Sequence, residues 1–138
     1  MTTEEIEATL RAAVALRPPT WTPETAPAGK VDLIEDYLMR SAYSGAELEE
    51  AVAHLDATIA LLLRQIEEMT GYEAVLPNKA GDRITKADVL AAKRQVYPAV
   101  FDAGAEARQL RESIVRQLYR YEREAKTYSR LYTMITGG

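Results

Sequence analysis

The chain has 138 residues, the size of one domain, and its 47% hydrophobic and 28% charged residues are typical of an ordered protein rather than a disordered one. It contains no cysteine, which excludes disulfides, thiolate metal sites and a cysteine nucleophile. No apolar run is longer than 59–63, which is far shorter than the roughly 20 residues of a membrane span, and the acidic N-terminus lacks the apolar core of a secretory signal. We therefore expect a cytoplasmic protein with no membrane partner, or a virion-associated one if it is phage-encoded.

The net charge of −4 is unevenly distributed along the chain. Residues 1–71 have 5 basic and 13 acidic side chains, a net charge of −8, whereas residues 72–138 have 12 basic and 8 acidic side chains, a net charge of +4. Two interpretations follow. The halves can neutralise each other within the chain, or they can be exposed and attract partners or other copies.

The first helix is predicted at 3–16. Thr2 or Thr3 can cap its N-terminus, and the acidic side chains that follow suit the positive end of its dipole. An apolar residue recurs at every fourth position, which indicates one buried face. The helix is expected to end before Pro18-Pro19, because a residue that precedes proline avoids the helical region.

Residues 17–29 contain four of the six prolines and the only tryptophan, Trp21. Fixed φ angles and missing amide donors predict an extended linker or arm. Trp21 is its one large apolar side chain. It can hold the arm on the helical body of its own chain, or it can anchor the arm on a neighbouring subunit.

A short helix is predicted at 30–42, followed by a long helix at 45–70. Ser44 and Glu47 have the spacing of a capping box, which predicts Ser44 as the N-cap of the long helix. Gly71 suits a glycine C-cap. The apolar positions of the long helix alternate in steps of four and three, the pattern of a coiled-coil seam. These positions are Leu48, Val52, Leu55, Ile59, Leu62, Ile66 and Met69.

Residues 71–84 interrupt the helical pattern and predict a loop or a small hairpin, with a turn at 77–81. Thr85 then has the form of an N-cap with an acidic residue three positions later. The helix that it opens must end or kink at Pro98. A new helix can begin there, because proline is favoured in a first turn.

A second long helix is predicted at about 99–134. Its apolar positions repeat in steps of three and four, with one extra residue between Ile114 and Leu118. They are Ala107, Leu110, Ile114, Leu118, Tyr121, Ala125, Tyr128, Tyr132 and Ile135. Two seams of similar length predict antiparallel packing. The expected fold is therefore all-α: a single domain over 1–138, a helical bundle on two long antiparallel amphipathic helices with coiled-coil-like seams, short extra helices and a Pro-rich arm.

Residues that could perform catalysis or bind a metal are few. The only histidine, His54, has Glu50 one turn before it, but a helical metal site needs several inward carboxylates from more than one helix. No nucleophile elbow, phosphate-binding loop or dinucleotide motif is present in the sequence. We expect no catalytic, cofactor-binding or metal-binding residues, no small-molecule substrate and no enzymatic activity.

The candidate partner-binding residues combine arginine and tyrosine on the last helix with the tryptophan of the arm. Arginines can pair with phosphates while tyrosines stack on bases, or both can pack against a protein. Tyr121, Tyr128 and Tyr132 fall on the seam, where burial favours the protein interpretation. The candidates are Trp21, Arg116, Tyr119, Arg120, Arg123 and Arg130.

These observations predict a non-enzymatic helical assembly or adaptor protein that binds itself as a homo-oligomer, or binds a larger protein assembly. An Ala- and Arg-rich helical chain with a Pro-rich arm resembles phage or mobile-element accessory proteins in general character, without a shared motif. That resemblance implies a connector or scaffolding component. Two alternatives stay open: a nucleic-acid-binding accessory protein that uses the Arg/Tyr face, and an inhibitor of a host enzyme that acts through the acidic half.

Overall fold

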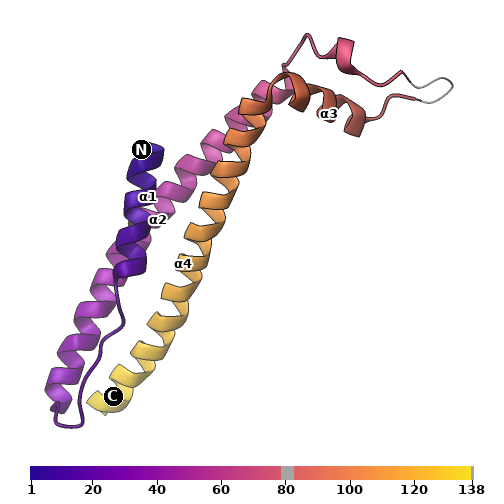
Figure 1. Ribbon diagram of the computed structural model, residues 1–138. Helices are drawn as coiled ribbons and strands as arrows, with labels where there is room; N and C mark the ends of the chain where they lie inside the picture. Colours follow the sequence, from indigo (N-terminus) through magenta and orange to yellow (C-terminus); the bar gives the residue numbers. More distant parts are fainter. Residues whose placement is uncertain (79–82, 138) are drawn as a thin grey trace. The chain divides into compact units, whose positions relative to one another are not determined.

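The computed structural model describes residues 1–78 and 83–137 and confirms the all-α fold class (Figure 1). Its helices are α1 (Thr3–Ala15), α2 (Pro27–Glu67), α3 (Lys86–Val96) and α4 (Pro98–Thr136), with a 3-10 turn, η1 (Glu73–Val75), after α2. The described residues contain no strand. The two long helices, α2 and α4, pack closely as a bundle.

The chain divides into two compact units. The first unit comprises Met1–His54 and Glu112–Gly138, and the second comprises Leu55–Arg111. Helices α2 and α4 each have one segment in the first unit and another in the second. In the first unit, α1 lies beside α2 and beside the middle of α4 (Figure 1).

Helix α1 forms where its sequence predicts, but the predicted apolar face is only partly buried, because Val14 is 44% exposed. Thr2 is the N-cap, and its hydroxyl oxygen accepts a hydrogen bond from the amide of Glu5 at 3.1 Å. Ile6 and Ala13 are buried on its inner face. The helix ends at Ala15, ahead of the two prolines, as expected.

The prediction of two helices divided at Ser44 is wrong, because α2 runs without a break from Pro27 to Glu67. Ser44 lies inside this helix, and its hydroxyl oxygen is 3.0 Å from the hydroxyl oxygen of Tyr121. Buried positions continue on one face past the predicted break, from Ile34 through to Leu48. Burial of this face outweighs the local capping signal, since most helical stability in proteins comes from packing.

The arm is shorter than predicted, because α2 begins at Pro27 instead of residue 30. Pro27 is in the first turn, where a missing amide donor costs nothing. The extended segment before it closes with a turn in which the amide of Thr25 donates to the carbonyl oxygen of Thr22 at 3.1 Å.

The end of α2 also differs from the prediction. The helix ends at Glu67, four residues before the glycine expected to cap it. Gly71 has a φ of +79°, a left-handed conformation that favours glycine, so it forms a bend in the following loop rather than the cap itself. The hydroxyl of Tyr97 donates to the carbonyl oxygen of Thr70 at 2.7 Å and holds that loop.

In the second unit, residues 71–78 form a loop that contains η1, and neither they nor residues 83–84 form a strand. Part of the predicted turn at 77–81 lies outside the described residues. Thr85 is the N-cap of α3 with a complete capping box to Asp88, as predicted. Pro98 is the first residue of α4, which also confirms the expected new start.

The long helices are antiparallel in the first unit, as predicted. Three pairs of hydrogen-bonded side chains join them, and the residue number on α4 falls as the residue number on α2 rises. The pairs are Glu35 with Tyr132, Tyr37 with Glu124, and Ser44 with Tyr121. The seam prediction is supported by burial, because Leu48, Leu55, Ala107, Ile114 and Tyr121 are buried and the other seam positions are half-buried.

Candidate interaction surface

The part of α4 in the first unit has two faces with different roles. The inner face packs on α1 and α2 and includes Gln117, Arg120, Tyr121 and Glu124. The opposite side has exposed side chains in steps of three and four residues, which place them in one row along the helix. We call this row the basic stripe. It consists of Arg116, Tyr119, Arg123, Lys126, Arg130 and Met134.

The inner face of α4 holds the carboxyl-terminal end of α1. The last carbonyl oxygens of a helix lack partners within the helix, and α1 has no basic residue in its last turn. Side chains of α4 supply the donors instead. The hydroxyl of Tyr121 donates to the carbonyl oxygen of Ala13 at 2.7 Å. A guanidinium nitrogen of Arg120 donates to the carbonyl oxygen of Leu16 at 3.1 Å. This contact fixes α1 on α4.

Arg120 also belongs to a polar network between α2 and α4. Its Nε lies 2.9 Å from Glu124 Oε1, and both side chains are mostly buried. Glu124 accepts a second hydrogen bond from the hydroxyl of Tyr37. Burial, followed by the bond to Glu124, raises the pKa of Tyr37 well above that of a free tyrosine, and the same carboxylate raises the pKa of Arg120.

These contacts separate Arg120 from the other candidate partner-binding residues. Its guanidinium is engaged by three groups of its own unit, namely Glu124, Gln117 and the carbonyl oxygen of Leu16. It therefore serves the packing of the first unit, and its role in binding a partner stays a prediction.

The remaining candidates on α4 lie together on the basic stripe. Tyr119 is 58% exposed, and Met134, one turn beyond Arg130, is 77% exposed. Arg116 pairs with Glu112 of the same helix at 2.6 Å. Among the residues that the structure describes, neither Arg123 nor Arg130 has a carboxylate at ion-pair distance. Two guanidinium groups, about 10 Å apart along the helix, are thus available to an acidic partner.

Trp21 lies half-buried beside α2 of its own chain. The ammonium of Lys30 is 5.7 Å from the centre of its ring, within the range of a cation–π contact. This position agrees with the interpretation in which Trp21 holds the arm on its own helical body. Docking of Trp21 on another subunit stays a prediction.

A second exposed row, on α2, was not identified from the sequence. Met39 is 69% exposed and Tyr43 is 71% exposed, and carboxylates lie before and after them. The division expected at Ser44 concealed this row, because its members lie on both sides of that residue in one continuous helix. We call it the acidic stripe. It consists of Asp36, Met39, Tyr43, Glu47 and Glu50.

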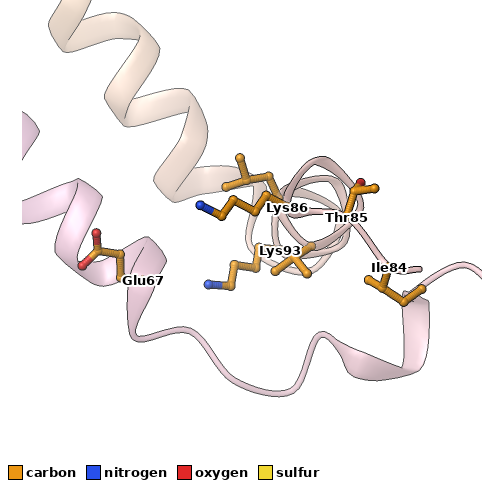
Figure 2. Close-up of a pocket in the computed structure, with 7 residues that line it drawn as sticks. Glu67, Ile84, Thr85, Lys86 and Lys93 are labelled. Atoms are coloured by element: carbon orange, nitrogen blue, oxygen red, sulfur yellow. The ribbon is translucent and has the colours of Figure 1, made fainter.

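The second unit contains an open pocket of about 530 Å³ beside α3 (Figure 2). Its lining residues are Glu67, Ile84, Thr85, Lys86, Val89, Leu90 and Lys93. The amines of Lys86 and Lys93 extend to the side on which Glu67 lies (Figure 2). The ammonium of Lys93 is already engaged, since it donates to the carbonyl oxygen of Ile66 at 2.7 Å and lies 5.1 Å from the ring centre of Tyr72. Lys93 therefore caps the end of α2.

His54 is exposed on α2. Within residues 1–78 and 83–137, no group of three or more His, Cys, Asp or Glu side chains is placed to hold a metal ion. In the same part of the chain, no helix combines the length and hydropathy that crossing a membrane requires.

Comparisons of the chain with protein-family models, curated proteins and solved structures found no match.

Proposed function

We propose that this chain is a non-enzymatic helical assembly or adaptor protein that acts by protein–protein contact through the basic stripe of α4. The main support is the exposure of Tyr119 and Met134 beside two arginines that lack carboxylate partners among the described residues. Large apolar side chains at the surface gain most when a partner removes them from water. Tyrosine and arginine are also the residue types most enriched at binding hot spots.

The inner face of α4 supports the same proposal. A contact surface costs less binding free energy when its residues are already held in place, because fewer side chains and segments must be ordered. Arg120 and Tyr121 fix α4 to α1 in the first unit, so the basic stripe stands on a supported helix. A connector or scaffolding component of a phage particle is one assembly role of this kind.

The proposal is tested with the tagged full-length chain and a variant of the stripe. The variant is Tyr119→Ala/Arg123→Gln/Arg130→Gln, and the matched control is Arg11→Gln/Arg108→Gln, which removes two exposed charges elsewhere. Light scattering over a range of concentrations measures self-association. Cross-linking in the cells that produce the tagged chain, followed by affinity capture, identifies other protein partners.

The wild type and the control are expected to associate or to capture the same proteins, and the stripe variant is expected to lose both properties. A wild-type chain that stays monomeric and recovers no protein that depends on the stripe would overturn the proposal.

The same two arginines are the observation that favours an alternative, nucleic-acid binding. Phosphate contacts would make affinity fall as salt rises, and Tyr119 could stack on a base. Arg123→Gln/Arg130→Gln tests this role without disturbing Arg120, which packs internally. The alternative predicts a smaller salt dependence of single-stranded DNA binding in this variant. Equal affinity of the variant and the wild type would exclude the stripe as the nucleic-acid site.

A further inference from the structure

We infer that the partner of the basic stripe is a second copy of this chain, which docks the acidic stripe of its α2 there. The inference rests on the proposed function and names the partner. It makes the association heterologous, since two different surfaces meet at each contact.

The most exposed large apolar side chains lie on the two stripes. Among the described residues, the four most exposed large hydrophobic side chains are Met134 at 77%, Tyr43 at 71%, Met39 at 69% and Tyr119 at 58%. All four lie in the first unit, and each stripe has one methionine and one tyrosine. Two such rows can cover each other and remove these side chains from water, which neither row achieves alone.

The two stripes have opposite charge. The acidic stripe has the carboxylates of Glu47 and Glu50 next to Tyr43, and neither has an ion-pair partner within the described part of the chain. The basic stripe has the guanidinium group of Arg123 one turn from Tyr119 and that of Arg130 one turn from Met134. Complementary charge around an apolar contact brings the surfaces together and selects the partner.

The two stripes also have compatible geometry. Each stripe follows steps of three and four residues, the rows along which packed helices meet. The acidic stripe from Asp36 to Glu50 spans about 21 Å, and the basic stripe from Arg116 to Met134 spans about 27 Å. The acidic stripe can therefore lie along the basic stripe over its whole extent.

One molecule cannot satisfy both stripes itself. In the first unit, α2 and α4 contact each other through their inner faces, as the bond between Ser44 and Tyr121 illustrates. The two stripes lie on the outer sides of these helices and are exposed. The contact therefore has to join different copies. Repetition of a heterologous contact produces a ring if the rotation closes and a filament if it does not.

The test uses two charge-reversal variants of the full chain. Variant one, Arg123→Glu/Arg130→Glu, puts carboxylates at two cationic positions of the basic stripe, and variant two, Glu47→Lys/Glu50→Lys, puts ammonium groups at two anionic positions of the acidic stripe. Each variant alone is expected to associate about 10- to 100-fold more weakly than the wild type, because like charges meet. An equimolar mixture is expected to regain association, since every contact then joins opposite charges. Sedimentation velocity measures the association, and circular dichroism checks that each variant is folded.

The outcomes separate this inference from the proposed function. If the wild type associates but the mixture stays monomeric, the pairing of these two stripes is overturned. If the wild type is monomeric at its highest soluble concentration and yet captures another protein through the basic stripe, self-docking is overturned and the adaptor function stands. If neither association nor stripe-dependent capture occurs, both fail. Arg11→Glu/Arg108→Glu, which reverses two charges outside the stripes, is expected to associate like the wild type.

Discussion

The hydroxyl of Tyr121 donates to the carbonyl oxygen of Ala13 at 2.7 Å and joins the end of α1 to the middle of α4. A phenol has one hydrogen, so the hydroxyl of Ser44, 3.0 Å away, must donate to Tyr121 rather than accept from it. One buried tyrosine thus connects all three helices of the first unit.

Tyr121→Phe removes this connection and leaves the ring in place. The carbonyl oxygen of Ala13 and the hydroxyl of Ser44 each lose a partner, so we expect the free energy of unfolding to fall by about 1–3 kcal/mol. Urea denaturation followed by circular dichroism measures the change. Tyr119→Phe is the matched control: its ring is exposed, and its effect should be within about 0.5 kcal/mol. Equal effects of the two substitutions would contradict the role of Tyr121.

Arg120→Gln tests whether this arginine stabilises the fold. The substitution leaves Glu124 without its cationic partner in a mostly buried site and removes the bond to Leu16. We expect a loss of about 1–3 kcal/mol in the free energy of unfolding. Arg123→Gln, one turn away and exposed, should change it by less than about 0.5 kcal/mol. If Arg120→Gln and Arg123→Gln were equally stable, the prediction that Arg120 stabilises the fold would be wrong.

Stability should fall at alkaline pH because of Tyr37. Its pKa is raised in the folded chain, chiefly by burial, above the value of about 10 in an unfolded one. The unfolded state therefore loses its proton first, and the stabilising effect is complete below pH 10 and declines as the pH rises above it. Tyr37→Phe removes this contribution, so its free energy of unfolding should depend less on pH between about 10 and 11. Parallel pH profiles for the variant and the wild type would refute this expectation.

Lys93→Met tests the cap at the end of α2 in the second unit. Methionine keeps the apolar stem but loses the donor to Ile66 and the cation over Tyr72. Positive charge at a helix C-terminus and a cation–π contact each contribute about 0.5–1 kcal/mol. Hydrogen exchange of the last turns of α2 should accelerate accordingly. Lys86→Met, at an exposed position of α3, is the matched control and should leave the exchange rate of α2 unchanged.

The exposed stripes show where local sequence reasoning reached its limit for the candidate site. The arginines of the last helix were proposed from residue type, because arginine alternates with tyrosine over a locally basic stretch. The internal role of Arg120 was not identified from the sequence, because its contacts with Leu16 and Glu124 depend on how the helices pack. Met39 was missed for a related reason, because its row becomes visible only when α2 is known to be continuous.

The sequence by itself determined the helical class, the cap at Thr85, the start of α4 at Pro98 and the sides of the long helices that are buried. These features depend on hydrophobic period, caps and proline, which act within a few residues. Only the tertiary structure decided that α2 continues through Ser44. That residue has the local signal of a helix start, but the buried face of α2 against α1 and α4 stabilises the helical path more than one cap can oppose.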